Sequence, residues 1–173
     1  LDLGRVFLAG LFAVESAVRV LHLAVAVEDE ADRNAGDAQL VGELALGVAH
    51  DEVFDITPYA EAMTRYFLRH PLAASLPRKF KIAFECCADD HALTGMHDIG
   101  FKALAQHSGS SVIRGFRVTV GGGTSIMCKS GALLDDFVPA GEIFNVAEAI
   151  VRVFDRFGDY KHKQRNRMKF MMQ

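Results

Sequence analysis

The stretch "HDIGFKALAQHSGSSVIRGFRVTV", residues 97–120, is the part of the sequence that most directly predicts the fold. Residues 97–107 and 112–120 are rich in strand-forming side chains, and the "SGSS" between them is typical of a turn. From Phe116 to Val120 apolar and polar side chains alternate, as they do in a strand with one buried face. The stretch therefore predicts two neighbouring strands joined by a short turn.

Helices are predicted on both sides of these strands. In "DITPYAEAMTRYFLRHP" Thr57 is a suitable N-cap and Pro58 fits the first helical position, where its missing N–H costs nothing. Pro71 is expected to end this helix. A second helix is predicted from about 141–157, with its apolar residues on one face and Gly158 as its C-cap. The pattern predicts an α+β protein in which helices back a sheet.

The composition is that of an ordinary soluble globular protein. The chain has 173 residues, a length that suits one domain with a hydrophobic core. Its formal net charge of −3 predicts neither general nucleic-acid binding nor attraction to a membrane. Residues 1–30 are apolar, but Arg5, Glu15 and Arg19 interrupt them, so no uncharged run is long enough to span a bilayer.

The sequence contains several cysteine, histidine and aspartate residues, the types that serve as metal ligands or as acids and bases, but their spacing matches no recognisable site. In the central region these are Cys86, Cys87, Cys128, His91, His97, His107, Asp89, Asp90 and Asp98. Three cysteines are too few for a disulfide framework, so we expect buried thiols and a reducing, cytoplasmic setting. Their spacing does not match zinc or iron–sulfur ligands, and the histidines are too irregular for a metal site. We therefore predict no metal ligand in this chain.

A pair of lysines within "LPRKFKIAFE" is the first candidate for a functional site. Residues 79–85 are predicted to form a strand, whose alternation puts the aromatic side chains on one face and Lys79 and Lys81 on the other. Two fixed ammonium groups suit an anionic substrate or a polycarboxylate cofactor. The alternative is an edge strand whose lysines discourage pairing with other chains. The pattern by itself leaves both open.

Two further stretches also suit anions. In "VGGGTSIM" the glycines 121–123 let backbone N–H groups approach an anion closely, although a simple strand-ending turn explains them as well. In "GDYKHKQRNRMKF" an extended chain would place five basic residues on one face, namely Lys161, Lys163, Arg165, Arg167 and Lys169. Such a run can bind carboxylates, or it can be a solvated or RNA-contacting tail. The chemistry indicated is anion binding.

Together these stretches resemble the nitrite/sulfite reductase haemoprotein family, and they occur in the order of that family from about Gly47 to Phe170. The stretches are "DEVFDITPYAEAMTRYFLRHP", "LPRKFKIAFE", "HDIGF", "GFRVTVGGGTSIM" and "VAEAIVRVFDRFGDYKHKQRNRMKF". The resemblance implies a mixed, largely antiparallel sheet flanked by helices. It implies six-electron reduction of sulfite to sulfide, or of nitrite to ammonia. The cofactors implied are sirohaem and a 4Fe–4S cluster, and the implied electron donor is ferredoxin or a flavoprotein.

The resemblance also implies roles for particular residues. Lys79 and Lys81 are expected to bind the substrate oxyanion as catalytic residues. The residues expected to bind sirohaem carboxylates, or to lie beside the cofactor, are Lys163, Arg165, Arg167, Lys169, Gly121, Gly122 and Gly123. A nucleic-acid partner and a membrane are not expected.

The sequence departs from the family pattern in two places. The cluster cysteines of the family, spaced C-x5-C and C-x3-C, do not occur, and residues 1–46 show no family motif. We interpret residues 47–173 as a partial haemoprotein domain and leave residues 1–46 unassigned, with a non-native beginning as one interpretation. This chain alone is expected to be inactive. The alternatives are a non-catalytic anion- or RNA-binding module, and a related sirohaem-family enzyme of cobalamin biosynthesis.

Overall fold

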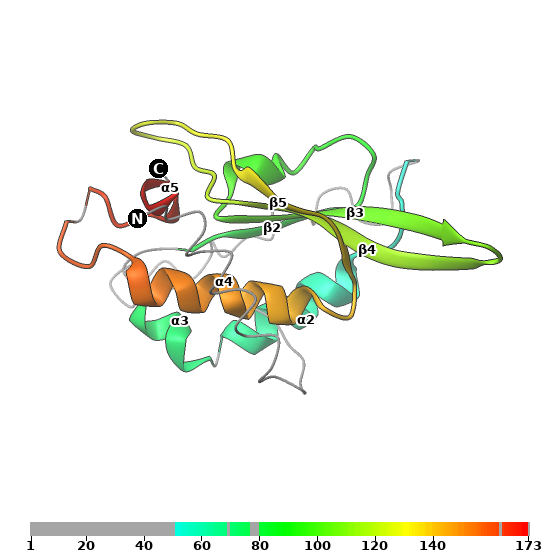
Figure 1. Ribbon diagram of the computed structural model, residues 1–173, viewed down its shortest axis with the longest axis horizontal. Helices are drawn as coiled ribbons and strands as arrows, with labels where there is room; N and C mark the ends of the chain where they lie inside the picture. Colours follow the sequence, from blue (N-terminus) through cyan, green and yellow to red (C-terminus); the bar gives the residue numbers. More distant parts are fainter. Residues whose placement is uncertain (1–50, 69, 77–79, 163, 173) are drawn as a thin grey trace.

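The computed structural model of the protein describes residues 51–68, 70–76, 80–162 and 164–172 (Figure 1). The sequence-based predictions for residues 1–50, Arg78, Lys79 and Lys163 lie outside these ranges. The elements are α2 (Thr57–Phe67), α3 (Pro71–Ser75), β2 (Ile82–Glu85), the 3-10 turn η1 (Thr94–Met96), β3 (Ile99–Ser108), β4 (Ser111–Val120), β5 (Ala132–Pro139), α4 (Ile143–Phe157) and α5 (Met168–Met171). Within the described ranges no helix is long and apolar enough to cross a membrane.

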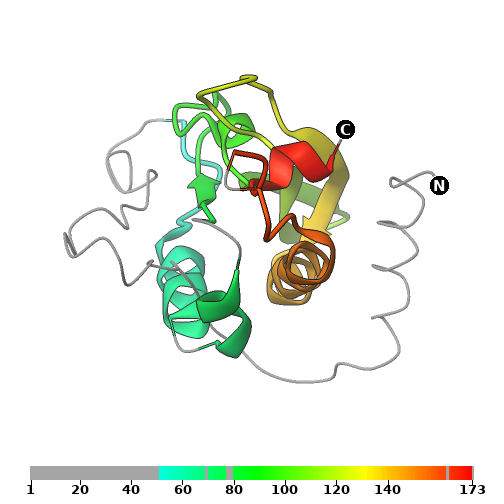
Figure 2. The same cartoon turned by 90° about the vertical axis from the view of Figure 1, so that its left-hand side faces the viewer.

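The four strands form one sheet in the order β2-β3-β4-β5. β2 pairs with β3 in parallel, and the other two pairs are antiparallel. The helices α2, α3 and α4 lie on the same side of this sheet, and the β3–β4 hairpin extends beyond them (Figures 1 and 2). The prediction of a mixed, largely antiparallel sheet flanked by helices is confirmed.

The predicted hairpin is also confirmed, with small shifts at its ends. The strands run over 99–108 and 111–120 instead of 97–107 and 112–120. Ser108 pairs with Ser111, and Gly109 between them has a φ of 61°, the left-handed conformation that glycine adopts without strain. The turn chemistry of the sequence therefore set the register of the two longest strands.

β5 was not predicted from the sequence. Its residues do not alternate, because Asp135 and Asp136 are adjacent, and most of its side chains are exposed. Its pairing with β4 is irregular, with register shifts between Phe116 and Val118 and between Val118 and Thr119. Such a strand forms because β4 offers backbone groups that need hydrogen-bond partners. Its own residues do not show the alternation that would predict a strand.

An aromatic cluster on the helix side of the sheet forms the centre of the core. Phe84 on β2 stacks on Phe101 of β3 with ring centroids 4.9 Å apart. Phe116 on β4 lies edge-on to both rings, at 5.7 and 5.9 Å. Phe80 is buried as well, while Lys81 is exposed, as the predicted alternation requires. The alternation in burial does not continue along the segment, because Ala83, Phe84 and Glu85 are all buried. Of the described residues 80–85 in the predicted strand 79–85, residues 82–85 pair as β2.

The helix ends differ from prediction at two prolines. The N-cap of α2 is Ile56 instead of Thr57, and Asp55 Oδ1 accepts a hydrogen bond from the Thr57 N–H at 2.9 Å. α2 ends at Phe67, and Pro71 begins α3 instead of ending α2. The reason is that proline fits the first turn of a helix as readily as it blocks a continuing one.

The predicted second helix is close to the observed one. α4 begins at Ile143, two residues after the predicted start, and ends at Phe157 as predicted. Gly158 is its C-cap, and the Gly158 N–H donates to the Phe154 carbonyl at 2.8 Å. The predicted apolar face of the helix packs into the core, where Ile150 and Phe154 are buried.

A polar contact joins α2 to α4. The Tyr66 hydroxyl donates to Glu148 Oε2, and Arg152 Nε donates to Glu148 Oε1 at 2.8 Å. Burial raises the pKa of Glu148, but the hydrogen bonds from Tyr66 and Arg152 outweigh it and hold this pKa below its usual value. Burial and the carboxylate together raise the pKa of Tyr66. The contact is therefore a charge-assisted hydrogen bond between helices.

Tyr66→Phe is expected to lower the free energy of unfolding by about 1.5 kcal/mol, since it removes a donor to a partly buried carboxylate. Chemical denaturation measures the difference. Tyr59→Phe is the control, because the Tyr59 ring packs against Phe54 and Phe116 as a core aromatic. Equal stability of Tyr66→Phe and the wild type would contradict the role given to this contact.

Candidate functional site

The three predicted anion-binding stretches meet at one buried residue, Asp98, just before β3. The Lys81 N–H donates to Asp98 Oδ2 at 2.9 Å. Arg167 donates to the same carboxylate through Nε at 3.3 Å and Nη2 at 2.8 Å. The Asp98 carbonyl accepts a hydrogen bond from the Gly121 N–H at 2.9 Å. Asp98 thus connects the lysine segment, the glycine loop and the basic run.

Sequence reasoning assigned no role to Asp98. Its side chain is 1% exposed, and burial raises its pKa while the Arg167 guanidinium opposes that rise. A carboxylate in this position is stable only because cationic and N–H donors surround it. The only signal in the sequence was its place in the "HDIGF" stretch.

The glycine loop is packed against the chain itself. The N–H groups of Gly121, Gly122 and Gly123 donate to the carbonyls of Asp98, His97 and Lys129, at 2.9, 3.0 and 2.9 Å respectively. All three glycines are buried. These N–H groups are therefore used inside the protein, and the strand-ending turn, one of the two interpretations of the sequence, is what the structure contains.

The basic run does not form the continuous stripe expected of an extended chain. Arg165 is exposed, Arg167 is paired with Asp98, and Lys169 is only 3% exposed. The Lys169 Nζ donates to the carbonyls of Thr124 and Ile126, both at 2.7 Å. Arg167 and Lys169 are therefore not part of an open basic stripe.

Lys169 thereby fixes the loop that follows the glycines. At the tip of this loop Ile126 is 71% and Met127 is 62% exposed. Ser125 and Met127 have positive φ angles of 72° and 56°, a conformation that is costly for residues with a side chain. The two hydrogen bonds from Lys169 hold an apolar, strained loop tip open to solvent.

Lys169→Met is expected to loosen this loop. It keeps the aliphatic stem but removes two charge-assisted hydrogen bonds, a loss of about 1.5 kcal/mol in local stability. Opening of residues 124–129 should rise about tenfold, which faster tryptic cleavage after Lys129 and faster amide exchange would report. Lys161→Met is the matched control, because Lys161 is exposed. Unchanged exchange in Lys169→Met would contradict this role of Lys169.

His97 is a second residue that sequence reasoning left out of the site. Its ring is half-buried, with Nδ1 3.1 Å from the Leu93 carbonyl. Burial lowers the pKa of His97, and the positive charge of Lys81 lowers it further. Both effects favour the neutral imidazole, so His97 is a hydrogen-bonding group near Lys81.

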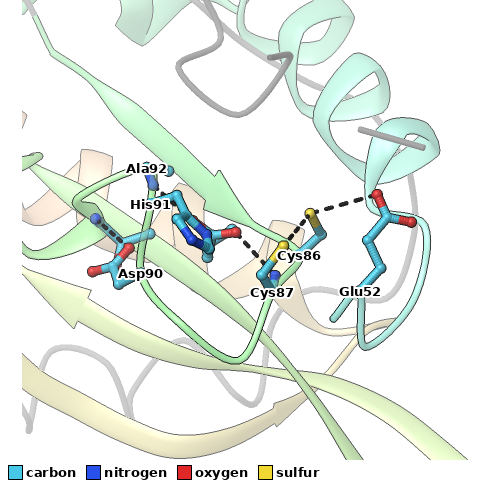
Figure 3. Close-up of polar contacts among 8 residues, drawn as sticks. Glu52, Cys86, Cys87, Asp90, His91 and Ala92 are labelled. Atoms are coloured by element: carbon cyan, nitrogen blue, oxygen red, sulfur yellow. Dashed lines mark hydrogen bonds and ion pairs between the residues drawn. The ribbon is translucent and has the colours of Figure 1, made fainter. Parts of the chain in front are cut away.

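The cysteines are all free thiols, but only two of them are buried. Cys86 Sγ lies 3.4 Å from Cys87 Sγ and 3.8 Å from Glu52 Oε1 (Figure 3). Burial raises the pKa of both thiols. The prediction of buried thiols is confirmed for this pair and is wrong for Cys128, which is exposed in the loop after β4.

The site therefore consists of the exposed Lys81 next to the buried Asp98 and its partner Arg167, at one end of a mixed sheet. The family described as nitrite and sulphite reductase 4Fe-4S domain matches residues 38–173. The chain therefore belongs to this family.

Individual relatives agree with the family match. The chain is 31% identical over 131 residues to the sulfite reductase (ferredoxin) 1 of Mycolicibacterium paratuberculosis, covering 76% of this chain and 23% of that protein. It is 28% identical over 138 residues to the ferredoxin–nitrite reductase of Leptolyngbya laminosa, covering 77% and 26%. The structure of the Mycobacterium tuberculosis NirA protein matches with a TM-score of 0.59 and 29% identity, over 72% of this chain and 22% of that one. The chain thus spans about a quarter of the length of these relatives.

Proposed function

We propose that this chain is part of a sirohaem-dependent reductase that reduces sulfite to sulfide or nitrite to ammonia by six electrons. The observation that carries the proposal is the exposed Lys81 held beside the buried Asp98 and its partner Arg167, in a chain of this family. Relatives are named for sulfite and for nitrite, and for ferredoxin, so we propose these anions as substrates and ferredoxin or a flavoprotein as donor. We place the protein in the cytoplasm, and assign residues 47–173 to the partial reductase domain, leaving 1–46 unassigned.

Lys79 and Lys81 are the proposed substrate ligands. The main chain at Lys81 is fixed by its hydrogen bond to Asp98, so the side chain begins from a rigid position. A preorganised ammonium group stabilises an oxyanion without reorganising during the reaction. The proton on Lys81 Nζ is also available to an oxygen that leaves the substrate.

A 4Fe–4S cluster does not fit the cysteines of this chain. Such a cluster takes four cysteine thiolates, and the chain has three cysteines. Cys86 and Cys87 are buried in the core, and Cys128 is exposed on a separate loop. We therefore assign no cluster ligand to these residues, and we expect the chain alone to be inactive.

Sirohaem fits the surface around the glycine loop better. The exposed, apolar loop tip at Ile126 and Met127 suits the face of a macrocycle, and basic residues suit its carboxylates. Among the basic residues, we propose Lys163 and the exposed Arg165 as carboxylate partners. Sirohaem, when bound, would supply the iron at which the substrate anion is reduced.

The other residues predicted to bind the cofactor are proposed to act by shaping this surface. Arg167 is committed to Asp98, and the amine of Lys169 to two carbonyl groups. Gly121, Gly122 and Gly123 donate their N–H groups within the chain, and Gly122 allows the loop to approach the backbone of residues 95–97 closely. Their role in the proposal is to position the loop tip.

Exchange of the matching segment in the M. paratuberculosis enzyme for residues 51–172 of this chain tests the proposal. The chimera is expected to show sirohaem absorbance and to reduce sulfite or nitrite. Lys81→Met in the chimera should lower kcat/KM by about tenfold, because Lys79 retains part of the charge. Lys102→Met, a half-buried lysine on β3, is the control. A chimera that binds sirohaem but loses no more activity with Lys81→Met than with Lys102→Met would refute the role of Lys81.

A further inference from the structure

Three side chains of types that can bind a metal meet at the C-terminal end of β2, whereas Lys81 precedes its N-terminal end. Asp51, Cys87 and His91 each offer a ligand atom, and the three atoms lie within 4.8 Å of one another. Asp51 comes from the segment before α2, whereas Cys87 and His91 come from the loop after β2, where Figure 3 shows Cys87 and His91. The tertiary structure therefore brings together one carboxylate, one thiol and one imidazole.

Backbone contacts fix this arrangement. Glu52 and Cys87 form an antiparallel bridge, and the Val53 N–H donates to the Cys86 carbonyl at 2.7 Å. The buried Glu85 accepts hydrogen bonds from the N–H groups of Cys87 and Ala92, at 2.9 and 2.6 Å, which closes the loop that carries His91. Cys87 is therefore held rigidly, and Asp51 is its neighbour across the bridge.

The burial of the three side chains suits a metal ion at the surface. Cys87 is fully buried, while Asp51 and His91 are exposed, so an ion could enter from solvent and be held against the thiol from outside. Ligand atoms around zinc lie about 3.5 Å apart when each bond is about 2.0–2.3 Å. Rotation of the exposed Asp51 and His91 side chains can bring their ligand atoms to this spacing. Three protein ligands leave a fourth position for water.

The charges around the cluster favour a cation. Glu85 Oε2 lies 4.0 Å from His91 Nδ1, and the loop also contains Asp89 and Asp90. The sequence has no lysine or arginine from residue 82 to 96. A divalent cation would therefore meet net negative charge.

A second group in the same region is less suited to an ion. Glu85, Cys86 and Cys87 also have ligand atoms within 4.8 Å of one another, but all three are buried. Both carboxylate oxygens of Glu85 already accept backbone N–H groups. An ion there would have no exposed ligand through which to enter, so the group with Asp51 and His91 is the better site.

We propose that Asp51, Cys87 and His91 bind one divalent cation of the zinc type, at a site separate from the proposed reductase site. On binding, the S–H bond of Cys87 breaks, a bond between its sulfur and the metal forms, and the proton passes to solvent. Zinc sites in proteins use carboxylate, imidazole and thiolate ligands. The ion ties the segment before α2 to the loop after β2.

Metal titration of the purified 173-residue chain tests this proposal. After chelator treatment in a thiol-free reductant, Zn²⁺ is expected to bind with one equivalent per chain, and Co²⁺ to give a tetrahedral spectrum with a sulfur-to-cobalt charge-transfer band. His91→Ala and Asp51→Asn should each weaken binding by more than about 100-fold, beyond the 10–100-fold typical of outer-shell changes. Cys87→Ser should abolish the charge-transfer band.

The controls separate this site from chance binding. Cys128→Ser and His107→Ala remove an exposed thiol and an exposed imidazole elsewhere, and both should bind Zn²⁺ as the wild type does. Because Asp51 and His91 are exposed, their variants should keep the circular dichroism of the metal-free protein even if Cys87→Ser fails to fold. The proposal is overturned if no saturable one-equivalent binding occurs. Equal Zn²⁺ affinity of His91→Ala and the wild type, or loss of binding in Cys128→Ser, also overturns it.

Discussion

Gly122→Ala is expected to lower the free energy of unfolding by about 3 kcal/mol, through overpacking at a position where backbone meets backbone. A Cβ atom at residue 122 would lie 2.1 Å from the Gly95 carbonyl oxygen and 2.8 Å from that of His97. Neither oxygen can easily retreat. The Gly95 carbonyl accepts the Gly131 N–H at 2.7 Å, and the His97 carbonyl accepts the N–H of residue 122 itself at 3.0 Å.

The same chain offers a matched control for this substitution. A Cβ atom at Gly141, in the turn before α4, would have nothing within 4 Å. Gly141→Ala should therefore leave stability unchanged or raise it slightly, by reducing the entropy of the unfolded chain. Urea denaturation of both variants measures the comparison. Equal stability of the two variants would mean that the glycine loop does not approach residues 95–97 as closely as described.

Arg167→Gln is expected to lower the free energy of unfolding by a similar amount, about 3 kcal/mol at neutral pH. It removes the charged partner of a carboxylate that is 1% exposed, and an unpaired buried charge is strongly destabilising. Arg165→Gln, an exposed arginine two residues earlier, is the control and should change stability by less than about 0.5 kcal/mol. A similar loss in both variants would contradict the special role of the Asp98–Arg167 pair.

The loss in Arg167→Gln should depend on pH in a defined direction. Burial already raises the pKa of Asp98 above its ordinary value of 3.8, and removal of the guanidinium raises it further. The folded state then binds a proton more tightly than the unfolded state does. The stabilisation that the variant gains from a protonated Asp98 is complete below pH 3.8, and it is lost as the pH rises through the folded-state pKa of Asp98. The gap between Arg167→Gln and the wild type should therefore be small near pH 4 and widen toward pH 7, which denaturation at several pH values would test.

The local pattern of the sequence determined most of the regular elements. Alternation and turn residues predicted β3 and β4, and the apolar face of α4 appeared at helical spacing. The exposed Lys81 beside the buried Phe80 followed from the same alternation. These features depend on neighbours a few residues away, so they can be read from one stretch at a time.

The order of the motifs determined the family, which the match over residues 38–173 confirms. The motifs did not indicate how the basic residues are used. Arg167 and Lys169 were expected to bind sirohaem carboxylates, which stays a prediction, and within the chain their partners are Asp98 and the carbonyls of residues 124 and 126. A basic residue looks the same in a sequence whether its partner is a ligand or a carboxylate 69 residues away.

Only the tertiary structure decided the two sites. Asp98 gained its role because β2 and β3 pair in parallel and the glycine loop returns to their starting end. Asp51 and Cys87 lie 36 positions apart in the sequence, and the bridge between Glu52 and Cys87 brings them together. The sequence predicted no metal ligand here, because two nearby ligands do not define a metal site and the third, Asp51, lies far from them in the sequence. Contacts between distant segments depend on how the whole chain packs, and the periodicity of a single segment carries no information about them.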